Sequence, residues 1–161
     1  MRNFLCGLIV AASLVAAGVV AAPAGAATKD PCKVLTTAEI SKAFDGATVS
    51  KGKKGLTTPV NAQCEYTVAA GSATPEGDVI VTMMTIGGQA AYDGLKTQSA
   101  AGYEVLTEIP KSIYNSKLSV VNTLKGKNLL GVQGLFRDAS FKQVDVKTQL
   151  VALDKAGLKR I

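Results

Sequence analysis

The clearest regular pattern in the chain is the alternation of residues 78–86, which has the two-residue period of a β-strand. Val79, Val81 and Met83 belong to one face of this strand, and the opposite face is also largely apolar. A strand with two apolar faces is typical of the middle of a sheet. Residues 78–86 therefore predict a central strand that a helix covers on one side.

Other stretches alternate over shorter lengths and also predict strands. They are residues 63–69, 103–109, 118–124 and 129–136. The last two flank the polar, glycine-containing residues 125–128, which predicts a hairpin. Residues 51–55 combine two glycines with lysines, and we expect a loop or a hairpin tip there.

Three segments carry helical signals. Thr36 and Glu39 form a capping box at the start of a short helix over residues 37–44. A second short helix is predicted over residues 89–97, after a pair of glycines. Apolar residues at helical spacing predict a final helix from about residue 141 to residue 160.

The predicted order is a helix, two or three strands, a second helix, three strands and a final helix. This order predicts an α+β fold, in which helices pack against an antiparallel sheet. We expect about five to six strands, with the short helices and the C-terminal helix packed against them. The two passes from helix to strands suggest a duplicated unit, although the residues themselves show no clear repeat.

The first 27 residues differ in composition from the rest of the chain. Only Arg2 is charged among them, and the apolar stretch 5–20 is followed by Pro23 and by small residues. This pattern is typical of a secretory signal peptide, residues 1–27. An uncleaved membrane anchor is the alternative, because the apolar run is long enough to span a bilayer. We expect cleavage, which leaves residues 28–161 as a single α+β domain without a stable membrane anchor.

Removal of the signal peptide would leave two cysteines, Cys32 and Cys64. An exported chain enters an oxidising compartment, so we expect these two residues to form a disulfide. The bridge would close a loop of about 33 residues and stabilise the fold by about 3.5–4 kcal/mol. The alternatives are two buried thiols or half of a zinc site, and one chain without histidine cannot complete a tetrahedral zinc site from two cysteines.

The chain contains no histidine, which excludes a Ser-His-Asp triad, a Cys-His pair and imidazole metal ligands. Glu104 and Glu108 are four residues apart on a predicted strand, so both would lie on one face, about 13 Å apart. The paired carboxylates of a glycosidase lie roughly 5–10 Å apart, and charges on a solvated face are the simpler interpretation. We therefore predict no catalytic residue, no metal site and no cofactor.

Basic residues outnumber acidic ones, and the net charge of the whole chain is +6. Lys51, Lys53 and Lys54 form a dense basic group, which is a candidate contact for an anion, an envelope polymer or another partner. The alternative is a solvated turn without a binding role. Basic residues are not interleaved with aromatic ones, so we do not expect nucleic acid to be a partner.

Residues 30–40 read Asp-Pro-Cys-Lys-Val-Leu-Thr-Thr-Ala-Glu-Ile. They resemble the Pro-Cys-x-Leu-Leu-Thr-x-Ala-Glu-Val opening of a family of secreted actinobacterial proteins of unknown function, most of which are lipoproteins. Cys64, Glu65 and Tyr66 are similar to that family's second cysteine and the aromatic strand that follows it, and the second half of the chain is similar more loosely. Many members carry a lipid-attachment cysteine at the cleavage point, which this chain lacks, and this favours a released form.

The resemblance implies a cell-envelope or extracellular location, no catalytic residues and a binding role. We therefore expect an exported, non-enzymatic binding or accessory domain whose partner is an envelope or extracellular protein or polymer. One alternative is an extracellular hydrolase that uses carboxylates such as Glu104 and Glu108. Another is an inhibitor that docks onto an extracellular enzyme through protruding loops with exposed aromatic residues.

Overall fold

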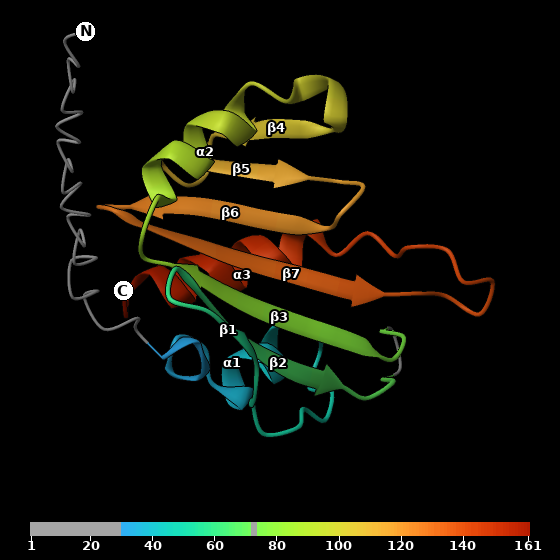
Figure 1. The fold of residues 1–161 in the computed structure, drawn as a ribbon. Coiled ribbons are helices and arrows are strands. Elements are labelled where there is room, and N and C mark those ends of the chain that lie inside the picture. The colour runs from blue at the N-terminus through green and yellow to red at the C-terminus, as the bar shows by residue number, and fades with distance from the viewer. Residues whose placement is uncertain (1–29, 72–73) are drawn as a thin grey trace, which may run out of the picture.

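The computed structural model describes residues 30–71 and 74–161 as helices on both faces of one antiparallel sheet (Figure 1). The helices are α1 (Thr37–Ala43), α2 (Gly88–Lys96) and α3 (Lys147–Leu158), with short 3₁₀ turns η1 (Pro31–Lys33) and η2 (Ser99–Ala101). The strands are β1 (Lys53–Thr57), β2 (Asn61–Val68), β3 (Gly77–Met84), β4 (Tyr103–Leu106), β5 (Ser112–Asn115), β6 (Val120–Lys125) and β7 (Asn128–Phe136). Their order in the sheet is β1-β2-β3-β7-β6-β5-β4. The predicted signal peptide, residues 1–27, lies outside the described residues.

The α+β class and the antiparallel sheet are confirmed, but the described sheet has seven strands instead of the expected five or six. The expected loop at residues 51–55 is wrong, because β1 begins at Lys53 and pairs along the edge of β2. β1 is mostly exposed, so its sequence shows no apolar face. β5 was not predicted, because all four of its residues are buried and its sequence therefore does not alternate.

Two predicted boundaries are also wrong. β4 ends at Leu106, and the chain then bends towards Lys111, whose φ of +56° turns the backbone. α3 begins at Lys147 rather than near residue 141, because the Asp138 carboxylate accepts hydrogen bonds from backbone amides that follow it. These hydrogen bonds form a turn over residues 138–142, where the predicted helix would have begun.

The helices divide the sheet into two unlike faces. α1 and α3 pack on what we call the core face, where Val79, Val81 and Met83 of β3 are fully buried. α2 packs on the opposite face, called the open face, and contacts β4, β6 and β7 there (Figure 1). The alternate residues of β3 on the open face are only half-buried. The prediction of a central strand with a helix on one side is therefore confirmed for β3, which is an inner strand of the sheet and is covered on its core face, whereas α2 packs mainly over β4, β6 and β7.

The N-terminal segment is fixed to β2 by a covalent bond and by hydrogen bonds. Cys32 and Cys64 form the expected disulfide, with their Cα atoms 5.1 Å apart. The buried Tyr66 hydroxyl donates to the carbonyl oxygen of Leu35 at 2.9 Å. The capping box is also present, since the Glu39 amide donates to the Thr36 hydroxyl and the Thr36 amide donates to the Glu39 carboxylate. The start of α1 is thereby placed over the core face.

The C-terminal residues contact the same region, around the start of α1. Arg160 donates to both carboxylate oxygens of Glu39, at 2.8 and 3.0 Å, and to the carbonyl oxygen of Val34 at 2.9 Å. Burial opposes ionisation of Glu39, but the hydrogen bonds from Arg160 and Thr36 outweigh it and hold the pKa of Glu39 below its ordinary value. Within residues 30–71 and 74–161, none of the helices combines the length and the apolar character that crossing a membrane requires.

Candidate functional site

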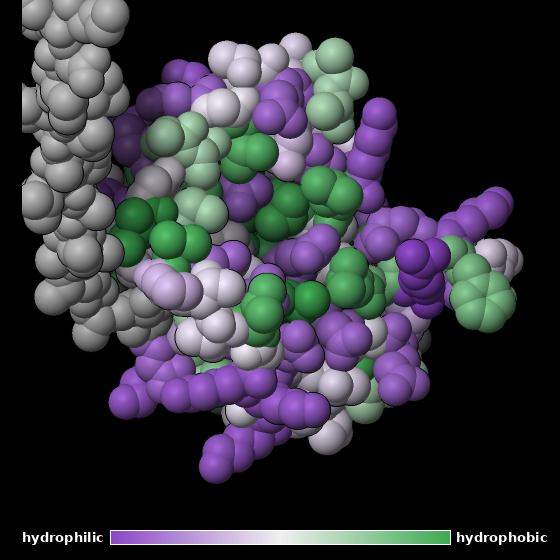
Figure 2. All heavy atoms as spheres, in the orientation of Figure 1, coloured by the Kyte–Doolittle hydropathy of each residue, from purple (hydrophilic) through white to green (hydrophobic). Residues whose placement is uncertain are grey.

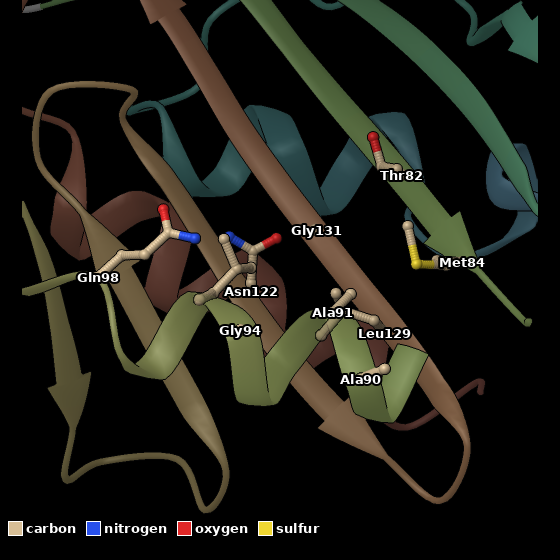
Figure 3. A pocket seen from close by; sticks show the side chains of 10 residues that line it. Thr82, Met84, Ala90, Ala91, Gly94, Gln98, Asn122, Leu129 and Gly131 are labelled. Atoms are coloured by element: carbon tan, nitrogen blue, oxygen red, sulfur yellow. The ribbon is translucent and has the colours of Figure 1, made fainter. Parts of the chain in front are cut away.

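A groove lies between α2 and the open face of the sheet, with a volume of about 430 Å³ (Figure 3). It extends from Gln98 and Asn122 across β7 to Thr82 and Met84 on β3, and the side of α2 forms its wall. In the view of Figure 2, apolar side chains gather around α2 and across the neighbouring strands. The groove is therefore part of a larger apolar area on the open face.

Small residues create this groove. Gly131 lies on its floor in β7, and Ala90, Ala91 and Gly94 line its wall in α2. A Cβ atom at Gly131 would lie 3.2 Å from the Asn122 side-chain oxygen and 3.5 Å from the Thr82 Cβ atom. A side chain at Gly131 would therefore project between two groove residues. The absence of a side chain at this position keeps the floor open.

One end of α2 is packed closely against the sheet, so the groove has a fixed wall. Tyr92 belongs to a small apolar cluster with Ile113, Leu124 and Leu129 beneath the helix. At the N-terminus of α2, a Cβ atom at Gly88 would lie only 2.6 Å from the Lys127 carbonyl oxygen. Only glycine allows this close approach of the helix to the β6–β7 hairpin.

The polar groups of the groove are neutral. They are the Thr82 hydroxyl and the amides of Gln98 and Asn122, and none of the groove-lining residues carries a charge. Thr82 and Asn122 are half-buried and Gln98 is exposed, so a bound molecule can reach all three. Figure 3 shows the amide of Gln98 extending towards Asn122 at one side of the groove. An apolar surface with a few neutral hydrogen-bonding groups suits an uncharged ligand.

Three other hollows of the described residues differ from this groove because each has charged residues in its lining. A hollow of about 350 Å³ between α1 and α3 includes Glu39 and Lys42. A smaller hollow of about 240 Å³ includes Asp30 and Arg160. The fourth, of about 340 Å³, lies beside the β6–β7 hairpin and includes Lys125, whose amine donates to a carbonyl oxygen at the end of α3. Their charged groups are partly engaged by the protein itself.

The structure does not bring the predicted lysine group together. Lys53 and Lys54 are consecutive residues of β1, and consecutive side chains of a strand point to opposite faces. Lys54 approaches Asp30, with 3.5 Å between its amine nitrogen and the carboxylate oxygen. Lys51 precedes the strand and is exposed. The strand therefore separates Lys54 from Lys53, and Lys54 is turned towards Asp30.

Glu104 and Glu108 do not form a carboxylate pair on one strand. β4 contains Glu104 but ends before Glu108, which lies in an exposed bend, so the expected shared face is wrong. The Lys147 amine donates to the Glu104 carboxylate at 2.6 Å. This hydrogen bond raises the pKa of Lys147 above its ordinary value. Neither glutamate lines any of the four hollows described above.

A buried acidic residue is the feature that the sequence analysis missed. Asp154 of α3 is fully buried, and one of its oxygens accepts a hydrogen bond from the Thr123 hydroxyl at 2.7 Å. The Thr123 hydroxyl also contacts the Ser112 hydroxyl, and the other Asp154 oxygen has no hydrogen-bond partner among the described residues. Burial raises the pKa of Asp154 to about 7, although the bond from Thr123 opposes this shift. A sequence signal existed, because Asp154 lies four residues after Leu150 on the apolar stripe of α3.

Comparisons with known proteins give no further guidance, since no family model, curated protein or solved structure matches the chain. Among the described residues, no group of three or more acidic, cysteine or histidine side chains is placed to hold a metal ion. The groove under α2 is therefore the candidate site that the geometry itself supports.

Proposed function

We propose that this protein is an exported, non-enzymatic binding module of the cell envelope or extracellular space, and that the groove under α2 holds an uncharged, largely apolar small molecule. The observation that carries the proposal is a preformed groove of about 430 Å³ without a charged lining residue. Ligand pockets commonly have volumes of about 300–1,000 Å³, so the size fits a small organic molecule.

The lining favours neutral ligands over ions. A charged group that enters an apolar groove loses hydration, and without an opposite charge nothing compensates for this loss. The hydroxyl of Thr82 and the amides of Gln98 and Asn122 provide hydrogen bonds without a net charge. We expect these three groups to orient a ligand that has one or two polar atoms on an apolar body.

The surroundings of Glu104 favour binding over carboxylate catalysis. A hydrolase of the kind considered above needs two acidic groups that meet in one cleft. Glu104 is instead bonded to Lys147, and Glu108 lies outside the strand. The Cys32–Cys64 disulfide supports the export part of the proposal, because disulfides persist mainly in oxidising compartments. The family resemblance and the release from the membrane remain predictions of the sequence.

A pair of dyes tests the groove directly. N-phenyl-1-naphthylamine is neutral and fluoresces strongly in apolar surroundings, and its 8-sulfonate derivative has nearly the same shape with one negative charge. We expect the neutral dye to bind at least ten times more tightly than the sulfonate, because the groove offers no cation. Equal or tighter binding of the sulfonate would refute an uncharged ligand.

Two variants test whether the neutral dye binds in the groove. Gly131→Val adds a side chain between Thr82 and Asn122, and we expect it to weaken binding of the neutral dye at least tenfold. Thr67→Val changes the same sheet face at an exposed position of β2 outside the groove, and it should leave binding unchanged. Thermal unfolding of both variants checks that they are folded. If folded Gly131→Val bound the dye like the unmodified protein, the groove would not be the site.

A further inference from the structure

The loop between β7 and α3 exposes an aromatic side chain at a distance from the groove. It extends beyond the end of the sheet (Figure 1). Phe141 in this loop is 79% exposed, the largest fraction among the exposed large apolar residues of the described part of the chain. Burial of an aromatic side chain lowers the free energy, because apolar surface leaves water. The exposure of Phe141 is therefore unfavourable for the isolated protein.

Hydrogen bonds hold the loop in one conformation. The Asp138 carboxylate accepts from the amides of Ser140 and Lys142, at 2.8 and 3.0 Å. The backbone of Asp138 is also bonded to the backbone of Phe141 and Lys142, each at 2.9 Å. Arg137 donates from its side chain to the Phe141 carbonyl oxygen at 3.1 Å. The loop therefore presents Phe141 from a fixed backbone.

The backbone of Phe141 itself is unfavourable for its residue type. Its φ is +59°, in the left-handed region that glycine and asparagine tolerate best. A loop needed only to connect β7 with α3 would be served better by either of those residues. A strained backbone and an exposed ring thus coincide at one position, and both point to a role in contact with another molecule.

The surroundings of the ring define what it fits. Arg137 and Lys142 of this loop are exposed, whereas the Asp138 carboxylate accepts hydrogen bonds from backbone amides. Leu135 at the base of the loop is exposed as well. The loop is therefore an apolar tip with positive charges beside it.

We propose that the loop of residues 137–142 is a preformed anchor for a protein partner, with Phe141 entering an apolar pocket whose rim carries carboxylates. Aromatic anchors fixed before binding are common centres of protein interfaces, because little conformational freedom is then lost. A membrane surface fits less well, since one ring and a small net charge give weak attachment and a bilayer does not require a fixed loop. This inference is independent of the ligand in the groove.

Photo-crosslinking in the cells that make the protein tests the anchor. The photoreactive residue p-benzoylphenylalanine is placed at position 141, and in a control at position 105, where Val105 of β4 is 61% exposed. We expect a discrete adduct with a different protein from position 141 and none from position 105. A lipid adduct, a dimer of this chain, the same adduct from both positions or no adduct would each overturn the proposal.

Competition shows whether the loop chemistry is responsible for the adduct. Purified unmodified protein in excess should suppress it, and Leu56→Ala, a change at an exposed residue of β1, should suppress it equally well. Phe141→Asn should require at least tenfold more protein, and Lys142→Glu should also compete less well. Since asparagine tolerates a positive φ, Phe141→Asn is expected to melt at the same or a higher temperature. Equal competition by folded Phe141→Asn would show that the ring is not the anchor.

Discussion

The side chain of Asp154 places a carboxyl group inside the core, and its effect on the free energy of unfolding depends on pH. The unfolded chain releases the proton near pH 3.8, whereas burial raises the pKa of the folded protein to about 7. Between these values the folded state holds one proton more than the unfolded state. The contribution of Asp154 to stability is therefore fully present below about pH 4 and is lost as the pH rises towards 7.

Asp154→Asn should remove this dependence. Each pH unit between about 4 and 7 should lower the free energy of unfolding of the unmodified protein by about 1.4 kcal/mol relative to Asp154→Asn. Urea unfolding at several pH values measures the difference. Asp93→Asn, at an exposed position of α2, is the matched control and should follow the unmodified protein. Parallel pH profiles for the unmodified protein and Asp154→Asn would show that Asp154 ionises normally in the fold.

The buried Asp154 also shows what a residue pattern can and cannot reveal. Its place on the apolar stripe of α3 follows from the spacing after Leu150. Its partner does not, because Thr123 lies on β6 and meets α3 only through the packing of helix and sheet. The sequence thus shows that a polar residue lies on an apolar stripe, but it does not show which residue that side chain contacts.

At the scale of elements, α2 contains two glycines with different roles: Gly88 allows close packing on the β6–β7 hairpin, whereas Gly94 weakens the helix. Gly94 lies inside the helix, where glycine costs about 1 kcal/mol relative to alanine. A Cβ atom there would meet nothing within 4 Å. Gly94→Ala should therefore raise the free energy of unfolding by about 1 kcal/mol, as measured by urea denaturation.

Gly88→Ala is the matched control in the same helix. Its Cβ atom would lie 2.6 Å from the Lys127 carbonyl oxygen, so the helix would have to move away from the hairpin. We expect this variant to be destabilised while Gly94→Ala is stabilised. A stabilised Gly88→Ala would contradict the close packing of α2 on the sheet.

Elements with a clear period were predictable, and elements without one were not. β3, β7 and α1 follow from alternation and from the capping box. β1 is recognisable only from its pairing with β2, and β5 is buried too evenly to alternate. The groove was not predictable, because it forms where α2 meets β3, β6 and β7, and these contacts join distant parts of the chain. Local patterns do not specify such long-range pairings.

At the scale of the molecule, each short helix precedes an antiparallel run of strands. α1 is followed by β1, β2 and β3, and α2 by β4 to β7, and the first strand of each run lies at an outer edge of the sheet. α1 and α2 pack on opposite faces. Lys53 and Lys54 lie on one of these edges, where lysines hinder pairing with another chain. Protection of the edge is a simpler role for them than binding of an anion.

The disulfide should contribute strongly to the stability of the whole fold. Replacing Cys32 and Cys64 together by alanine should lower the free energy of unfolding by about 3.5–4 kcal/mol, because a closed loop of about 33 residues becomes open in the unfolded state. Urea denaturation measures this loss. A reductant should destabilise the unmodified protein and leave the double variant unchanged. Insensitivity of the unmodified protein to reductant would mean that the two sulfurs are not joined.

The contact of Arg160 with Val34 and Glu39 brings the last residues of the chain beside the first residues that the structure describes. A short peptide that links Ile161 to residue 30 could therefore join them, and new ends could be opened at the exposed Pro59 between β1 and β2. Such a circular permutant would keep every strand pair of the sheet. The architecture would then depend on which segments touch and not on the order in which the ribosome produces them.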